Sequence, residues 1–238
     1  MLRFFALGLA LLLAACASDP APSAADAALP DASPPDTVAA GAAAARLPAA
    51  ALTADQAAAD ALQAGDRAPS FTLPDADGAP TSLAEALAGG PVVLTFYRGS
   101  WCPYCNTQLQ DYAARYGALR DAGATLLAVS PQAAAGTAAM RDSLGGASVP
   151  FPVLSDVGNA VSRRYGLVFE VDEATQQRYR AVGIDLAQVN GRDTWELPVP
   201  ATYVIDRSGE IRAAFVEADY TQRASLDEVL EAVRRLRS

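Results

Sequence analysis

The sequence contains no lysine and no histidine, so arginine supplies all 18 of its basic residues. These absences exclude a histidine base, a Schiff-base lysine, a lysine-bearing phosphate loop and a histidine metal site. Acidic residues number 27, which gives a formal net charge of −9. Because nucleic-acid binding needs clustered cations that displace counterions, we expect no nucleic-acid partner. We also expect no metal ion and no cofactor.

Cysteine is scarce as well, and the three that occur are Cys16, Cys102 and Cys105. With histidine and lysine absent, these thiols are the main candidate nucleophiles. A chain of 238 residues, 51% of them hydrophobic, is long enough for one well-packed domain with tails,. The sequence therefore predicts a single folded domain whose chemistry depends on cysteine.

Residues 1–15 have the pattern of a secretory signal peptide. Arg3 supplies a positive charge, and an uncharged apolar run extends from Phe4 to Ala15,. This run is shorter than the roughly 20 residues that a helix needs to cross the hydrocarbon core of a bilayer. We therefore expect the segment to direct export and then to be removed.

The run ends in Leu13-Ala14-Ala15-Cys16, which resembles the lipobox of bacterial lipoproteins. The resemblance implies that Cys16 is acylated and anchors the mature protein in a lipid bilayer facing the periplasm. The absence of aspartate directly after Cys16 agrees with sorting to the outer membrane rather than the inner one. The alternative is an ordinary secretory signal followed by an incidental cysteine.

Residues 16–64 have the composition of a tether. From Ala17 to about Ala50 the chain is dominated by Ala, Pro, Asp and Ser, and it has too few large apolar residues to build a core,. We interpret this stretch as a disordered spacer that holds the domain clear of the lipid surface. A short helix is possible within Ala51–Ala64, but its alanine-rich faces predict weak docking.

The folded domain is expected to span residues 65–238. Runs of apolar residues predict strands at 91–97, 125–129, 151–154, 201–205 and 211–216,. Helical spacing and capping residues predict helices after Ser82, over 107–119, from Ser130 to Gly146 and from Ser225 to Leu236,. The alternation of strands and helices indicates an α/β fold with parallel pairing. Residues 166–198 have mixed polarity without clean periodicity, and we treat them as an inserted segment without a definite predicted structure.

The chemistry is expected at Cys102 and Cys105, in the segment Trp101-Cys-Pro-Tyr-Cys105. This segment joins a predicted strand to a predicted helix, where unpaired N–H groups and the helix dipole lower a cysteine pKa from its usual value of about 8.5. Pro103 suits a first helical turn, and the spacing brings the two sulfurs close enough for a disulfide. The pair is therefore predicted to open and close reversibly.

Three other interpretations of the pair are two buried free cysteines, a structural disulfide, and half of a zinc site. Zinc would need further ligands, and the sequence has no second cysteine pair and no histidine,. An exported chain with a strand, a Trp-Cys-X-X-Cys segment and a helix favours redox chemistry over these alternatives.

Four stretches of the domain carry motifs: Gly65-Asp-Arg-Ala-Pro-Ser-Phe-Thr-Leu73, Phe96-Tyr-Arg-Gly-Ser-Trp-Cys-Pro-Tyr-Cys105, Pro200-Ala-Thr-Tyr-Val-Ile-Asp-Arg-Ser-Gly-Glu-Ile-Arg212 and Asp219-Tyr-Thr-Gln-Arg223. Together they resemble the peroxiredoxin-like branch of the alkyl hydroperoxide reductase and thiol-specific antioxidant family. The resemblance extends from about Gly65 to Leu236. It implies a thioredoxin-like fold, with a central mixed sheet flanked by helices.

The resemblance supports two different assignments of the sulfurs. In ordinary peroxiredoxins the peroxidatic cysteine falls at Cys105, and a threonine that hydrogen-bonds the peroxide falls at Cys102. In thioredoxins the nucleophile falls at Cys102, the resolving cysteine at Cys105, and a cis-proline facing the disulfide at Pro200. Ordinary peroxiredoxins commonly have an arginine in place of Pro200, where it lowers the thiolate pKa and polarises the peroxide. Arg98 and Arg223 are the candidate substitutes.

Each of these arginines also has a plainer interpretation. Arg98 could be a solvated loop residue, and Arg223 could form a surface ion pair. Trp101 and Trp195 are expected to be packing groups. The sequence leaves open which sulfur attacks first.

Two enzymatic hypotheses follow, and the first is a peroxidase. A thiolate reduces a hydroperoxide and becomes a sulfenic acid, the other cysteine condenses with it to a disulfide, and a thioredoxin-type protein reduces the pair. In the second, the pair exchanges with disulfides of exported proteins. Domain length and the Phe96–Gly99 and Asp219–Arg223 motifs favour the peroxidase, whereas the Cys-Pro-Tyr-Cys spacing and Pro200 favour the oxidoreductase.

A third, non-enzymatic hypothesis is a lipid-tethered binding domain with a structural disulfide. The oligomeric state is not predicted.

Overall fold

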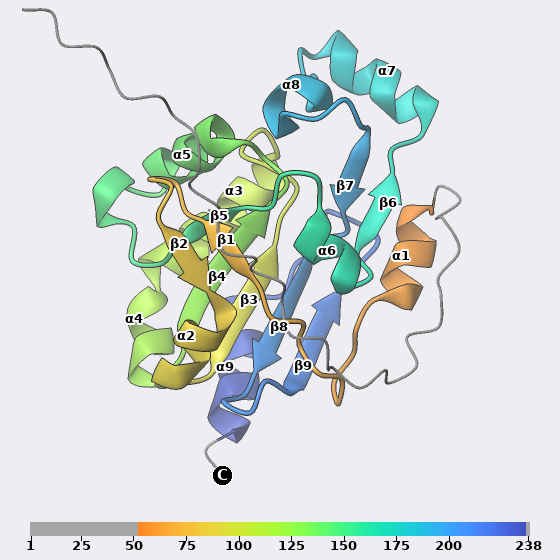
Figure 1. Cartoon of the computed structure of the whole chain (residues 1–238). Coiled ribbons are helices and arrows are strands. Elements are labelled where there is room, and N and C mark those ends of the chain that lie inside the picture. Colours follow the sequence, from red (N-terminus) through yellow and green to blue (C-terminus); the bar gives the residue numbers. More distant parts are fainter. Residues whose placement is uncertain (1–51, 237–238) are drawn as a thin grey trace, which may run out of the picture. The chain divides into compact units, whose positions relative to one another are not determined.

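A mixed five-stranded sheet in the order β5-β4-β3-β8-β9 forms the centre of the computed structural model, which describes residues 52–236 (Figure 1). Its strands are β3 (Val92–Phe96), β4 (Thr125–Ser130), β5 (Val153–Ser155), β8 (Ala201–Ile205) and β9 (Ile211–Val216). β3, β4 and β5 run parallel, and β8 runs antiparallel to both β3 and β9. All five strands were predicted, and the mixed sheet confirms the expected fold class. The signal peptide, Cys16 and the tether up to residue 51 lie outside the described residues.

Helices cover both faces of this sheet. One face packs against α3 (Pro103–Ala114), α4 (Tyr116–Asp121), α5 (Ala134–Ser143) and α9 (Leu226–Arg235), and the other against α1 (Ala54–Asp60), α2 (Leu83–Gly89) and α6 (Ala160–Arg164). Every residue of β3 is buried. A continuous apolar run such as 92–96 is what a strand covered on both faces requires.

Local capping signals fix the starts of several helices. The Ser225 hydroxyl accepts from the Glu228 N–H and the Glu228 carboxylate accepts from the Ser225 N–H, so the predicted capping box of α9 is confirmed,. Ser82 likewise accepts from the Glu85 N–H at the start of α2. Minor elements complete this part of the chain: the β1 (Thr72–Pro74) and β2 (Pro80–Ser82) hairpin and a 3₁₀ turn at Gly146–Ser148.

α1 belongs to the packed core, which contradicts the predicted weak docking. Ala57 is fully buried and Ala61 is 5% exposed, and the Leu62 N–H donates to the Tyr165 carbonyl over 3.0 Å. Small side chains let the helix approach the core closely, so a low hydrophobic content did not prevent docking. The packed core therefore begins before Gly65, the expected start of the domain.

The inserted segment 166–198 has a definite structure. It consists of β6 (Val168–Glu170), α7 (Glu173–Ala181), α8 (Leu186–Asn190) and β7 (Glu196–Pro198), with β6 and β7 paired antiparallel. A small separate cluster of Val171, Leu186 and Leu197 holds it together, and Trp101 packs against that cluster. The insertion is thereby attached to the loop that carries the cysteines.

Two features are absent from residues 52–236. No helix there is long and apolar enough to cross a membrane. No three His, Cys, Asp or Glu side chains in the same range come together in a way that could hold a metal ion.

Candidate active site

Cys102 and Cys105 lie where the central strand leads into a helix, as predicted. β3 ends at Phe96, Cys102 is the N-cap residue of α3, and Pro103 is its first helical residue,. Cys102 is 1% exposed and Cys105 is fully buried, and both thiols are free. The pair is therefore described in its reduced form.

Hydrogen bonds from distant elements hold the loop before the pair in place. The Ser100 N–H donates to Gln132 Oε1 over 2.7 Å, and Asn106 Nδ2 donates to the Ser100 carbonyl over 2.9 Å. Gly99 has φ +152°, and a Cβ at this position would collide with the Trp101 indole. Glycine is thus required for the loop to pass Trp101 closely.

The surroundings of Cys102 favour a thiolate. They lower its pKa from 9.0 to about 6, chiefly because the Cys105 thiol hydrogen-bonds to it. The Cys105 backbone N–H and the charges of Arg98 and Arg223 act in the same direction, while burial opposes them,. Cys102 is consequently ionised at neutral pH.

Cys105 has the opposite character. Burial raises its pKa well above 9.0, and its hydrogen bond and electrostatic interaction with Cys102 raise it further. Arg223 Nη2 donates to Cys105 Sγ over 3.6 Å, which partly offsets these effects. Arg223 therefore belongs to the site, and its interpretation as a surface ion pair is wrong.

Arg98 is buried in the wall of the site, and its interpretation as a solvated loop residue is also wrong. The residue is 3% exposed, and its guanidinium carbon lies 5.0, 5.7 and 4.0 Å from the ring centroids of Trp101, Tyr179 and Tyr220. Its Nη2 donates to the Tyr179 hydroxyl, whereas Nε and Nη1 have no hydrogen-bond partner among the described residues. These buried nitrogens thus retain unused N–H donors within the described part of the chain,.

A cavity of about 470 Å³ opens onto Cys102. Its walls include Arg98, Trp101, Tyr104 and Tyr220, and the inserted segment contributes Arg178, Tyr179 and Val182. Three of the four large hydrophobic side chains that are exposed in residues 52–236 line this cavity: Tyr104 (44%), Val182 (72%) and Tyr220 (44%). The sulfur is therefore reached through an aromatic, cationic opening.

The contribution of α7 was missed by sequence reasoning. Asp172 accepts from the Thr175 N–H at the N-terminus of α7, a capping signal that marks a helix,. No residue of α7 is buried, however, so no apolar face indicated where the helix would dock. The position of Tyr179 over the site depends on contacts between distant parts of the chain.

Trp101, which was expected to be a packing group, lines the cavity as well.

Pro200 differs from its prediction. No peptide bond within residues 52–236 is cis, so the Val199–Pro200 bond is trans. Pro200 is buried and directly precedes β8, which begins at Ala201 opposite Phe96. The chain passes in extended form from β7 into β8, and the trans isomer, favoured by about 0.5–1 kcal/mol, fits this path. The residue does not line the Cys102 cavity, and its role in the chemistry stays a prediction.

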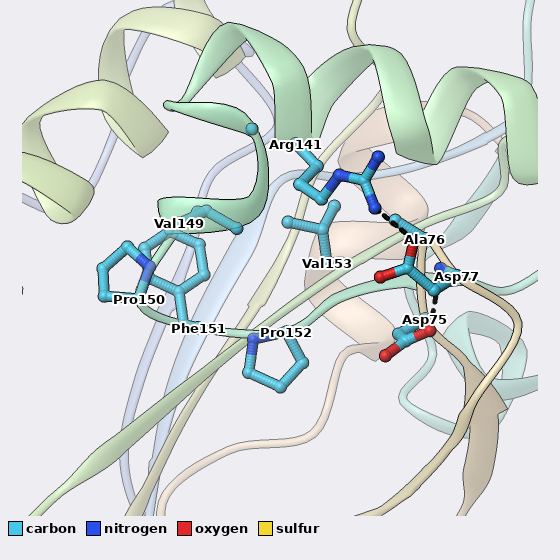
Figure 2. A pocket seen from close by; sticks show the side chains of 10 residues that line it. Asp75, Ala76, Asp77, Arg141, Val149, Pro150, Phe151, Pro152 and Val153 are labelled. Atoms are coloured by element: carbon cyan, nitrogen blue, oxygen red, sulfur yellow. Dashed lines mark hydrogen bonds and ion pairs between the residues drawn. The ribbon is translucent and has the colours of Figure 1, made fainter.

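A second hollow, of about 330 Å³, lies away from the cysteines (Figure 2). Arg141 pairs with Asp77 on one side at 2.5 Å, and Val149, Phe151 and neighbouring prolines form the other side. Arg141, the cationic group of this hollow, is therefore already paired with Asp77 and Asp142. The Cys102 cavity is therefore the better candidate for chemistry.

Comparison with known proteins identifies the family. The model of the AhpC/TSA family matches residues 64–214. The chain belongs to the AhpC/TSA family. A Mycobacterium tuberculosis protein provisionally named a peroxiredoxin is 32% identical over 164 residues, which cover 69% of this chain and 88% of that protein. Chloroplastic peroxiredoxin Q of Suaeda salsa is 27% identical over 172 residues, covering 72% of this chain and 68% of the relative.

Solved structures of AhpC/TSA proteins share the fold. The crystal structure of peroxidoxin BcpB from Mycobacterium tuberculosis superposes with a TM-score of 0.58 at 22% identity, covering 74% of this chain and 99% of that one. Mycobacterium tuberculosis AhpC gives a TM-score of 0.56 at 20% identity, with coverages of 75% and 94%. These likenesses confirm the thioredoxin-like fold, and the match over residues 64–214 confirms the family that the four motifs predicted.

Proposed function

We propose that this AhpC/TSA protein is a thiol-dependent peroxidase that reduces hydroperoxides with Cys102 and Cys105 and is regenerated by a thioredoxin-type protein. The observation that carries the proposal is the position of Cys102 at the N-cap of α3 and in the wall of an open cavity, where the Cys105 thiol and two arginines lower its pKa. Membership of the family and the peroxiredoxin relatives support the same reaction class.

In the first step, the Cys102 thiolate attacks the terminal oxygen of a hydroperoxide. The S–O bond forms as the O–O bond breaks, which leaves Cys102 as a sulfenic acid and releases an alkoxide that takes up a proton to become an alcohol, or water when the substrate is hydrogen peroxide. The positive charge of Arg98 in the cavity wall stabilises the negative charge that develops on the departing oxygen,.

In the second step, the Cys105 sulfur attacks the Cys102 sulfenic acid. The S–S bond forms, the S–O bond breaks, and hydroxide leaves with the thiol proton of Cys105 as water. A dithiol of the reductant then reduces the disulfide, becomes oxidised itself, and restores both thiols. One hydroperoxide is consumed for each reductant dithiol oxidised.

Cys102 rather than Cys105 is assigned the first attack, although Cys105 occupies the peroxidatic position of ordinary peroxiredoxins. Cys105 is fully buried and has a raised pKa, so it carries little thiolate at neutral pH,. Cys102 is ionised and lines the cavity. Resolution by a buried neighbour suits Cys105, because the two sulfurs are already hydrogen-bonded.

Thiol-disulfide exchange with exported proteins is the second candidate function. The arrangement favours it, because the nucleophile at the N-cap lines the cavity and its partner three residues later does not,. The trans peptide before Pro200 removes the cis-proline argument that had supported it. Peroxide reduction therefore remains the first candidate.

We further propose that Cys16 is acylated and anchors the protein to a bacterial membrane on the periplasmic side, preferentially the outer membrane. The proposal rests on Arg3, the apolar run from Phe4 to Ala15, and the position of Cys16 directly after it. Mass spectrometry of the mature N-terminus tests it. Diacylglycerol on Cys16 is the expected result, and an unmodified Cys16 or a cleavage site elsewhere would contradict it.

A sulfenic-acid trap tests the peroxidase. The reduced protein and its Cys102→Ser and Cys105→Ser variants would each receive one equivalent of hydrogen peroxide with dimedone, followed by mass spectrometry. We expect an unlabelled disulfide in the wild type, a dimedone adduct on Cys102 in Cys105→Ser, and no adduct in Cys102→Ser. Thiols that are inert to peroxide but reduce insulin disulfides would establish the exchange reaction instead.

A further inference from the structure

No carboxylate among residues 52–236 pairs with Arg98, although the chain is rich in acid. Aspartate and glutamate account for 27 residues, yet neither type lines the Cys102 cavity. The Arg98 side chain donates one hydrogen bond among the described residues, from Nη2 to the Tyr179 hydroxyl. A neutral group therefore holds this cation.

The remaining contacts of Arg98 are aromatic. Its guanidinium lies 4.0 Å from the Tyr220 centroid and 5.0 Å from the Trp101 centroid, within the range of cation–π attraction,. The ring faces attract the guanidinium but carry no net charge that would neutralise it. They fix the orientation of the guanidinium plane, and the hydrogen bond to the Tyr179 hydroxyl fixes the rotation of the group within that plane.

The neutrality of these partners has an electrostatic consequence. A carboxylate beside Arg98 would cancel most of its charge at Cys102 and would itself repel the thiolate. A phenol hydroxyl fixes the guanidinium and leaves its charge to act on the sulfur. Nε and Nη1 have no hydrogen-bond partner in the part of the chain that the structure describes.

Tyr179 is held firmly enough to direct Arg98. Its ring packs against Trp101 with centroids 5.3 Å apart, and it contacts the small cluster of Val171, Leu186 and Leu197 that stabilises the inserted segment. Its position is thus set by the insertion as a whole.

We propose that Tyr179 is a positioning residue for the reaction at Cys102: its neutral hydroxyl fixes the Arg98 guanidinium in the cavity wall without neutralising it. The inserted segment 166–198 thereby completes an active site whose sulfurs and arginine come from elsewhere in the chain. This role rests on the proposed function for its catalytic meaning, but the contact acts on Cys102 whether or not peroxide is the substrate.

Tyr179→Phe tests the role, because it removes the hydroxyl and keeps the ring. Thiolate formation at Cys102 is measured by absorbance at 240 nm. We expect its midpoint to move to higher pH in this variant. The rate constant for hydrogen peroxide at pH 6 should fall about threefold to tenfold, as loss of one hydrogen bond to a charged group implies. Tyr165→Phe is the matched control, because it removes a hydroxyl that donates to the Pro69 carbonyl over 3.3 Å and packs in the cluster that contains α1 and α2.

A second variant isolates the path through Arg98. In an Arg98→Gln background, Tyr179→Phe should cause no further change in the thiolate midpoint, since the residue it positions is gone. An unchanged midpoint in Tyr179→Phe, or equal shifts in both backgrounds, would overturn the proposal. A lower melting temperature without a midpoint shift would do the same, because it would mark a purely structural residue. If the wild type does not consume peroxide, the proposed function fails, yet the titration still decides this inference.

Discussion

Arg223 donates a hydrogen bond to the sulfur of Cys105 although 118 residues separate them in the chain. The loop after β9 brings the guanidinium to the first turn of α3, where its Nε is buried and has no hydrogen-bond partner among residues 52–236. Its charge lowers the pKa of both cysteines. Arg223 thus favours ionisation of both sulfurs, and the charge of Arg98 favours ionisation of Cys102.

The first prediction concerns the resolving step. Arg223→Gln removes the charge that favours ionisation of Cys105, so the Cys105 pKa should rise and the disulfide should close more slowly. We expect the rate of disulfide closure at pH 7 to fall several-fold. Closure is measured as the second phase of the change in tryptophan fluorescence after a pulse of peroxide. Arg120→Gln is the control, because it makes the same change of charge at an exposed ion pair with Asp121. Equal closure rates in the two variants would rule out this role for Arg223.

The second prediction concerns pH. Because the pKa of Cys102 is lowered to about 6, alkylation by iodoacetamide should accelerate as the pH rises through 6 and level off above it. Cys105→Ala removes the thiol that hydrogen-bonds to Cys102, which is the largest cause of the shift. Its midpoint should move toward 9.0, the ordinary value, and its rate at pH 7 should fall. A profile that is identical in the wild type and Cys105→Ala would show that the shift has another source.

Features marked by local signals were predicted from the sequence. The run at 92–96 and the capping box at Ser225 depend on neighbouring residues, and so does the placement of Cys102 at a helix N-terminus. Four short motifs were enough to indicate the family, and the match over residues 64–214 confirms it.

Features that depend on distant packing were not predicted. Tyr179 lies on a helix with no buried residue, so nothing in the periodicity of that helix pointed to Arg98. Arg223 was assigned to the surface because its partner is a sulfur across the fold rather than a nearby acid. The cis form of Pro200 was inferred by analogy, and the extended path into β8 does not need it. For Tyr179 and Arg223 the deciding contact joins residues that are far apart in the sequence.

The third prediction concerns the N-terminal boundary of the domain. A chain that begins at residue 65 lacks α1, whereas one that begins at residue 52 keeps it. The buried methyl groups of Ala57 and Ala61 and the hydrogen bond from Leu62 to Tyr165 are lost in the shorter chain. We expect its free energy of unfolding, measured in urea, to be lower by on the order of 2 kcal/mol. Equal stability of the two chains would mean that α1 contributes nothing to the fold.

The last prediction tests the same docking with a single methyl group. Gly166 has φ +76°, and a Cβ there would lie 2.5 Å from the Asp60 carbonyl oxygen of α1. Gly166→Ala must therefore displace the helix backbone, since a carbonyl cannot rotate away as a flexible side chain can. The left-handed backbone alone costs alanine about 1–2 kcal/mol, and we expect the collision to add about 1–3 kcal/mol.

Gly183→Ala separates these two costs. Gly183 has φ +79°, nearly the same backbone conformation, but a Cβ there meets nothing within 4 Å. The difference in unfolding free energy between the two variants therefore measures the contact with α1. In the chain that begins at residue 65 the difference should vanish, because the colliding carbonyl is absent. A difference that persists in that chain would show that Gly166 is required for a reason other than the approach of α1.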